Sequence, residues 1–328
     1  MPAGARGVQR AEGAVRVARP RLRWDALQVA LALLVFVQVW RLHDLVRGVA
    51  LPGFAILCTL AALLVFCLDR DPRRRLTGLN SWVVRPALGI LVLAALSVPG
   101  SLDPRFSFMF ILKDYLRSIL LMLLVAASVR GLGDLRRLAW VQILGVALCS
   151  LGALVGSHIG SDRRLQGVAF YDVNDLAMLI VCTLPLALYL WRRPASIAAR
   201  ALLVSVAVYV TVALVQTESR GGFLALLAVA VYLLVGFHGI SRAKRIGAVA
   251  LLGMMLVAVA SDRYFTRIQT LLHPSTDYNW SGRAETGRME IWKRGLGYME
   301  AHPVFGVGVA AFPKAEGTLA AEARERQR

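Results

Sequence analysis

The feature that most constrains this chain is a series of apolar runs that recur between residues 24 and 260. Each run is roughly 17–22 residues long, and about 20 apolar residues in a helix cross the ~30 Å hydrocarbon core of a bilayer. The chain is 57% hydrophobic and only 18% charged, outside the usual balance of a soluble domain. The runs therefore predict an all-α fold, a polytopic bundle of transmembrane helices.

Length and flanking residues indicate about nine spans, because hydrophobic periodicity carries little information in a helix that is apolar all round. Tryptophans lie at or near the edges of several runs, which is typical of a membrane interface. The predicted spans are 24–40, 50–68, 82–99, 106–129, 138–157, 175–191, 199–217, 221–238 and 246–260.

These spans divide the chain into a basic N-terminus (1–23), a transmembrane helical domain (24–260) and an outer segment (261–328). The net charge of +18 does not indicate a nucleic-acid partner, because the basic residues lie in the N-terminus and in short loops instead of on one soluble domain. Basic clusters such as Arg73–Arg75 occupy alternate loops, which is typical of the cytoplasmic side. We expect a cytoplasmic N-terminus and an outer segment on the opposite side of the membrane.

The outer segment contains one amphipathic pattern, RMEIWKRGLGYMEAHP. Met289, Trp292, Leu296 and Met299 recur at helical spacing on one face, and Pro303 ends the predicted helix. Such a helix lies along the membrane surface or packs on the rest of an outer domain, and the sequence leaves both alternatives open.

An arginine stands at the junction of the seventh and eighth predicted spans, within TESRGGFLALL. Arg220 is followed by Gly221 and Gly222, which open the next helix, and the amides and dipole of a helix start favour an anion. A guanidinium can bind two phosphate oxygens at once, so the pattern indicates a phosphate site. The alternative is an interfacial arginine that snorkels, with glycines that serve close helix packing.

The preceding outer loop, GSHIGSDRRLQGVAFYDVNDLAMLI, supplies further candidates on the same predicted side. Arg163 and Arg164 lie in it, and Asn174 with Asp175 is expected to cap the sixth span. Two basic sites on separate outer loops fit a phosphate-bearing ligand that approaches from the outer leaflet. An ordinary solvated loop is the alternative for the arginine pair.

The fourth span contains charged residues within FILKDYLRSILL. A charge near the centre of a bilayer costs roughly 2.5–3.5 kcal/mol on insertion scales, so Lys113, Asp114 and Arg117 should face protein or water. Alternatively the span begins near Tyr115, which leaves Lys113 and Asp114 at the interface. We count Lys113 and Arg117 among the candidate substrate-binding residues.

Two weaker patterns complete the outer side. Gly306 and Gly308 in HPVFGVGVAAF permit a tight turn, without the strand–helix context of a nucleotide-binding loop. The outer histidines, His158, His273 and His302, are not paired at metal-ligand spacing, and we expect no metal site.

Three of these motifs together resemble the O-antigen ligase and polysaccharide polymerase family of bacterial inner-membrane glycosyltransferases. They are RLQGVAFYDVNDLA in an outer loop, TESRGGFLAL at a helix junction and GRMEIWKRGLGYMEAHPVFGVGVAAF after the ninth span. The last is similar to the family's pattern of an arginine, here Arg288, a tryptophan four residues on, here Trp292, and a Pro-x-x-Gly-x-Gly turn. The resemblance covers most of the chain from about residue 80 onward.

The resemblance implies an enzyme that moves a glycan from an undecaprenyl-pyrophosphate carrier to a lipid A-core, protein or polysaccharide acceptor. Transfer takes place on the periplasmic face of the inner membrane, among membrane lipids and without a metal or other cofactor. The resemblance also implies that Arg164 and Arg220 hold the donor pyrophosphate and act in catalysis, by stabilising the charge that grows on the leaving group. The candidate substrate-binding residues are Arg163, Arg288, Asn174, Gly221, Lys113 and Arg117.

The chain departs from the family after the glycine turn. PKAEGTLAAEARERQR stands where family members have an outer-loop His-Asn pair and further spans, so the sequence names no general base. Two alternatives stay open: a transporter or lipid flippase with an arginine-lined cavity, and a non-catalytic, truncated member of the family. Transporters tend to show broken spans in corresponding halves, and no internal repeat is evident here.

Overall fold

The computed structural model describes residues 24–41, 53–71, 76–155, 165, 171–191, 196–277, 279–280 and 287–326. Over these residues the secondary structure is helical throughout, without a strand, so the predicted all-α class is confirmed. The helices are α1 (Ala26–Gln38), α3 (Phe54–Leu68), α4 (Val84–Ser97), α5 (Pro104–Phe110), α6 (Leu116–Ser128), α7 (Leu132–Val155), α8 (Val173–Trp191), α9 (Ile197–Gln216), α10 (Arg220–Val235), α11 (Arg242–Val259), α12 (Asp262–Gln269), α13 (Arg288–Ala301) and α14 (Phe312–Arg326).

Every predicted span coincides with one of these helices or, for 106–129, with α5, a π turn at Ile111–Tyr115 and α6 in succession. Their lengths differ from the expectation. Among the described helices, α7, α8 and α9 are each long and apolar enough to cross a membrane, and α11 with α12 forms one further candidate, bent by 114°. The long helices make the chain a multi-pass membrane protein. Because the apolar helices α1, α3, α4 and α10 are shorter, the nine-span topology remains a prediction.

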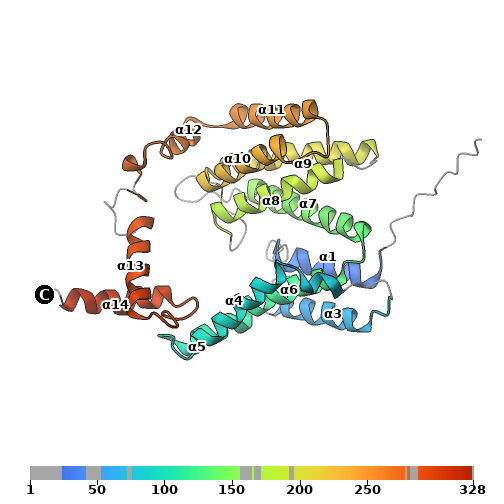
Figure 1. Cartoon of the computed structure of the whole chain (residues 1–328). Coiled ribbons are helices and arrows are strands. Elements are labelled where there is room, and N and C mark those ends of the chain that lie inside the picture. Colours follow the sequence, from blue (N-terminus) through green and yellow to red (C-terminus); the bar gives the residue numbers. More distant parts are fainter. Residues whose placement is uncertain are drawn as a thin grey trace, which may run out of the picture.

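The buried side chains form two clusters. One joins α7, α8, α9 and α10 around residues such as Ile143 and Ile180, and the other joins α1, α3 and α6 around Leu34. Figure 1 shows α7–α11 side by side, with α1, α3, α4 and α6 on one side of them. Large apolar side chains cover the outer faces, for example Leu93 and Met254. Apolar faces of this extent suit lipid as the surrounding solvent.

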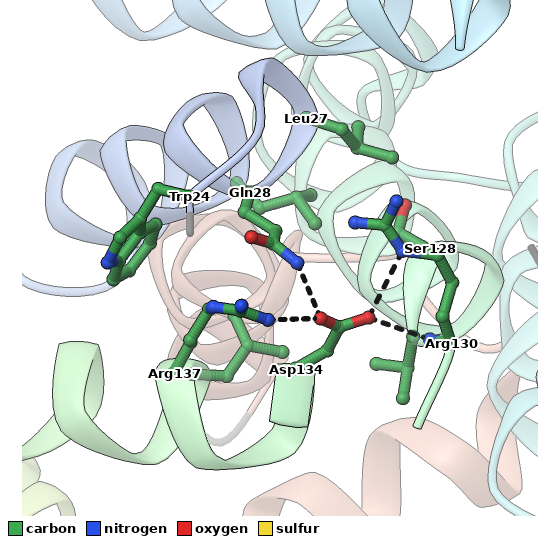
Figure 2. A pocket seen from close by; sticks show the side chains of 10 residues that line it. Trp24, Leu27, Gln28, Ser128, Arg130, Asp134 and Arg137 are labelled. Atoms are coloured by element: carbon green, nitrogen blue, oxygen red, sulfur yellow. Dashed lines mark hydrogen bonds and ion pairs between the residues drawn. The ribbon is translucent and has the colours of Figure 1, made fainter. Parts of the chain in front are cut away.

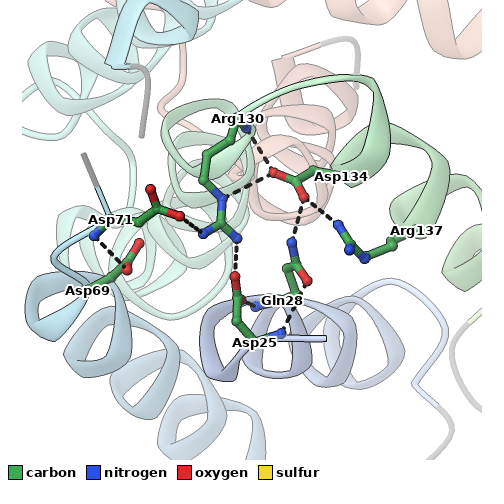
Figure 3. A network of polar contacts seen from close by, with 7 residues as sticks. All are labelled: Asp25, Gln28, Asp69, Asp71, Arg130, Asp134 and Arg137. Carbon is green, nitrogen blue, oxygen red and sulfur yellow. Dashed lines mark hydrogen bonds and ion pairs between the residues drawn. The ribbon is translucent and has the colours of Figure 1, made fainter. Parts of the chain in front are cut away.

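A buried polar network ties several helix ends together at one end of the bundle (Figure 3). Arg130, just after α6, donates from Nη1 to Asp71 Oδ2 (2.8 Å), from Nε to Asp134 Oδ2 (3.2 Å) and from Nη2 to Asp25 Oδ2. Asp134 Oδ1 also accepts from Gln28 Nε2 (2.5 Å). These bonds join the starts of α1 and α7 to the ends of α3 and α6.

The same network encloses little free space. Figure 2 shows Asp134 between Arg130, Arg137 and Gln28, beside a cavity of about 10 Å³ that is also lined by Trp24. That volume accommodates at most about one water molecule. The network therefore holds the helix ends together and is not a ligand pocket.

Helix α1 relates this end of the bundle to the opposite one. Asp25 caps the start of α1 inside the network. Just after the end of α1, the backbone carbonyl of Val39 accepts a hydrogen bond from the Tyr171 hydroxyl. Tyr171 precedes α8, so the starts of α1 and α8 lie at opposite ends of the bundle. The second end carries the candidate site.

Candidate functional site

Arg220 is the first residue of α10, and the adjacent N-cap fixes the start of this helix. Ser219 Oγ accepts from the Gly222 amide at 3.1 Å and donates to Asn174 Oδ1 at 2.8 Å. Asn174 lies in the first turn of α8. The structure therefore places two of the predicted site residues, Asn174 and Arg220, at neighbouring helix starts.

The predicted cap of the sixth span is confirmed for Asp175 and is wrong for the side chain of Asn174. Asp172 Oδ1 accepts from the amides of Asn174 (2.7 Å) and Asp175 (2.9 Å), and Asp175 Oδ2 accepts from the Asp172 amide in return. Asp172 is therefore the N-cap residue of α8, because its side chain accepts from two backbone amides of the first helical turn. Asp175 completes a capping box with it. Asn174 is left to bind Ser219.

Arg163 and Arg164 lie outside the described residues. The next residue along the chain, Leu165, is buried, and its amide donates to the Gln216 carbonyl at 2.9 Å. Gln216 is the last residue of α9. The residue after Arg164 is therefore bonded to the chain four positions before Arg220.

The guanidinium of Arg220 is held from the outer segment. Its Nη1 donates to Thr270 Oγ1 at 2.9 Å and forms an ion pair with Asp277 Oδ2. Asp277 Oδ1 accepts from both the backbone and the side-chain nitrogen of Asn279, each at 3.1 Å. Burial raises the pKa of Asp277, but the hydrogen bonds from Arg220 and Asn279 outweigh it and set the pKa below its ordinary value.

A second ion pair stands beside the first. Glu218 is buried, has a φ of +48°, and its Oε2 lies 2.8 Å from Arg267 Nε on α12. A glutamate at positive φ is a strained backbone position that the surrounding contacts must hold. Two carboxylate–arginine pairs thus join the start of α10 and the turn before it to the segment that begins with α12.

The two glycines after Arg220 have different roles. A Cβ at Gly222 would lie 2.7 Å from Ala177 Cβ, so this glycine permits close packing of α10 on α8, and its amide is already bonded to Ser219. A Cβ at Gly221 would meet only Ser219 Oγ, at 3.9 Å. The expectation that both amides approach a phosphate is therefore wrong for Gly222, and Gly221 stays a candidate.

The glycine turn of the outer segment docks on α5 and on the residues just before it. Gly306 and Gly308 have φ values of +62° and +100°. Ser101 Oγ donates to the Val307 carbonyl (3.3 Å), and Ser107 Oγ donates to the Val309 carbonyl (2.9 Å). The tight turn is confirmed, and its partner is protein.

The remaining candidates lie apart from one another. Arg288 begins α13 and is exposed, and the amide of its neighbour Met289 donates to the Asn279 carbonyl at 3.0 Å, which links α13 to the Asp277 segment. Lys113 is exposed on the π turn, and Arg117 pairs with Asp114 at 3.5 Å. No hydrogen bond or ion pair within the described part of the chain joins Lys113 or Arg117 to Arg220.

Helix α13 forms as predicted, and Figure 1 shows it at a steep angle to α7–α11. Its predicted apolar face is exposed at Trp292, Leu296 and Met299. The opposite face contacts α14, where Arg294 and the Tyr298 hydroxyl both bond to Glu316. The apolar face meets the outer segment at Trp292, whose ring lies edge-on to that of Trp280 with 5.5 Å between the ring centroids.

Within the described ranges, no group of three or more His, Cys, Asp or Glu side chains has an arrangement that holds a metal ion. Sequence reasoning missed Thr270 and Asp277, because neither residue belongs to a motif. A carboxylate within reach of Arg220 carries no signal at a separation of 57 residues.

Residues 205–327 match the family model described as O-antigen ligase. The match begins within α9 and ends just beyond α14, so it includes Arg220, Thr270, Asp277 and Arg288. No curated protein and no solved structure matches the chain.

Proposed function

We propose that this member of the O-antigen ligase family, which matches the family over residues 205–327, transfers a glycan from an undecaprenyl-pyrophosphate carrier to a lipid, protein or polysaccharide acceptor. In this proposal the chain lies in the bacterial inner membrane with a cytoplasmic N-terminus. The outer segment and the Arg220 end of the bundle then face the periplasm.

The observation that carries the proposal is the environment of Arg220. The side chain is about one-fifth exposed and stands at the start of α10, where the helix dipole favours an anion. Its contacts with described residues all use Nη1, which leaves Nε and Nη2 as adjacent donors. A guanidinium edge of this kind matches two oxygens of a phosphate group.

The chemistry follows from where charge develops. Breaking the bond between the glycan and its carrier leaves negative charge on a pyrophosphate oxygen, and a fixed cation lowers the energy of that transition state. Arg220 supplies this charge without a change of protonation state, since an arginine remains protonated. We assign Arg164 as a second cation, because Leu165 is anchored to Gln216 near the same helix start.

The other candidates have supporting parts in this proposal. Gly221 leaves open space beside the first amides of α10, and Asn174 fixes the N-cap Ser219. Arg288 and Arg163 are assigned to contacts with the glycan or the phosphates. Lys113 and Arg117, on the α5–α6 side, are assigned to a more distant part of the lipid-linked donor.

The test replaces Arg220 in cells that lack the chromosomal copy of the gene. We expect Arg220→Ala to abolish transfer, and undecaprenyl-pyrophosphate-linked glycan to accumulate, as measured by mass spectrometry of lipid extracts. Arg220→Lys keeps the charge but loses the planar edge, so transfer should fall strongly as well. Arg263→Ala is the matched control, because Arg263 is an exposed arginine on α12.

Protein levels separate a binding role from a structural one. The proposal requires Arg220→Ala to accumulate in the membrane like the wild type. Normal transfer by Arg220→Ala, with no donor accumulation, would contradict it. A variant that is degraded is replaced by Arg220→Lys, for which wild-type transfer would contradict the proposal equally.

A further inference from the structure

The contacts of Arg220 are asymmetric, and the asymmetry has a definite source. Thr270 Oγ1 and Asp277 Oδ2 both bind Nη1, one from the end of α12 and one from the segment that follows it. Neither residue belongs to α10, the helix that carries Arg220. The outer segment thus binds the guanidinium at Nη1 and leaves the edge formed by Nε and Nη2 for another ligand.

Asp277 is itself a rigid partner. Only 4% of the residue is exposed, and its second oxygen is fixed by the backbone and the side chain of Asn279. The Asn279 carbonyl in turn accepts from the Met289 amide at the start of α13. The carboxylate is therefore fixed on both sides, unlike a surface ion pair between two mobile side chains.

We infer that Asp277 is a positioning residue for Arg220: it holds Nη1 so that Nε and Nη2 face the pyrophosphate of a lipid-linked donor. This inference rests on the proposed function. The depressed pKa of Asp277 is consistent with it, because the carboxylate keeps its negative charge while a phosphate binds.

The same contact admits an opposite interpretation, which makes an opposite prediction. Asp277 would then occupy the place of the phosphate and would have to leave before the donor binds. Removal of its charge would strengthen donor binding without slowing the reaction. The bonds from Asn279 argue against departure, because leaving Arg220 would strand a buried carboxylate on those two donors alone.

Positioning affects rate more than affinity. An arginine side chain has many rotamers, and a misplacement of about 1 Å at a reacting group can cost on the order of a hundredfold in rate. Neutralising Asp277 also leaves Arg220 with an uncompensated charge, which attracts any anion. The expected result is a slower reaction at undiminished donor affinity.

The experiment compares Asp277→Asn and Thr270→Val with the wild type. The dissociation constant is measured for undecaprenyl pyrophosphate in nanodiscs. The rate is measured as the release of undecaprenyl pyrophosphate from endogenous lipid-linked glycan in membranes of the producing strain, per amount of folded enzyme. Glu290→Gln is the control, since Glu290 forms an exposed pair with Lys293 on α13.

We expect Asp277→Asn to lower the rate about tenfold or more while the dissociation constant stays within about threefold or falls. Thr270→Val, which leaves the Asp277 segment intact, should lower the rate by a smaller factor. A tenfold tighter dissociation constant at an unchanged rate would overturn positioning in favour of displacement. Wild-type rates for both variants would overturn it as well.

Arg220→Ala separates this inference from the function on which it rests. Loss of transfer in Arg220→Ala together with wild-type rates in Asp277→Asn and Thr270→Val would refute the positioning role alone. Full transfer by Arg220→Ala would refute the proposed pyrophosphate site itself.

Discussion

Two arginines at opposite ends of the bundle differ in how many carboxylates surround them, and this number decides whether each can bind an external anion. Arg130 pairs with Asp25, Asp71 and Asp134, and its side chain is 10% exposed. Arg220 pairs with one carboxylate among the described residues, that of Asp277, and its side chain is 21% exposed. Three carboxylates leave Arg130 no charge for an external anion, whereas one carboxylate leaves Arg220 a donor edge at a helix start.

The comparison also separates two uses of a buried charge. The Arg130 network joins the ends of four helices, so its contribution is to the stability of the fold. The pair of Arg220 and Asp277 is balanced in charge and joins one helix to the outer segment. A variant at the first site should damage the fold, whereas a variant at the second should damage donor binding (Arg220) or the transfer rate (Asp277).

The largest effect is expected at Asp134, which binds Arg130, Arg137 and Gln28. Asp134→Ala leaves two arginines without their shared carboxylate, at a cost of about 3–5 kcal/mol in stability. We expect little protein in the membrane fraction and a strongly lowered Tm of whatever is recovered. Asp114→Ala, at an exposed carboxylate, is the control and should behave like the wild type.

A direct comparison of the two arginines gives the next effect. Arg130→Ala should lower the Tm far more than Arg220→Ala, because it leaves three carboxylates without their arginine and Arg220→Ala leaves one. Arg220→Ala should instead lower the transfer rate by about 10²–10³-fold. Both quantities are measured on the same purified samples. Equal losses of Tm would mean that Arg220, too, is a structural residue.

A smaller effect is expected in the glycine turn. A Cβ at Gly308 would lie 2.0 Å from Ser101 Oγ at a φ of +100°, whereas a Cβ at Gly306 has open space. Gly306→Ala should cost about 1 kcal/mol for its positive φ alone, and Gly308→Ala should cost more and release the turn from Ser101. Hydrogen exchange of residues 305–311 would show it: only Gly308→Ala should accelerate exchange there.

The smallest effect concerns pH. The folded-state pKa of Asp277 is lowered, so its contribution to stability is full above the unfolded pKa of about 3.9 and is lost as pH falls through the folded pKa. The Tm difference between the wild type and Asp277→Asn should hold from pH 7 to about pH 5 and shrink on further acidification. A difference that grows on acidification would contradict this assignment.

The local sequence predicted much of this structure. The apolar runs located every described helix of the bundle, the amphipathic pattern located α13, and the Arg-Gly-Gly junction located the start of α10. Such features depend on neighbours along the chain, and periodicity, glycine and charge report them directly.

The contacts that define the site were not predictable in the same way. Asp277 meets Arg220 across 57 residues, and Ser101 meets Val307 across 206. The sequence around an aspartate or a serine does not indicate which distant residue it contacts, because tertiary packing determines that partner. The two glycines after Arg220 illustrate the same limit, since only the position of Ala177 shows that Gly222 serves packing.

The central claim is that the open edge of Arg220 binds a pyrophosphate, and its most direct test is the binding of undecaprenyl pyrophosphate to purified protein in nanodiscs. We predict that Arg220→Ala raises the dissociation constant by about tenfold or more, while Arg263→Ala leaves it unchanged. Wild-type affinity in Arg220→Ala, with protein of normal Tm, would contradict the claim.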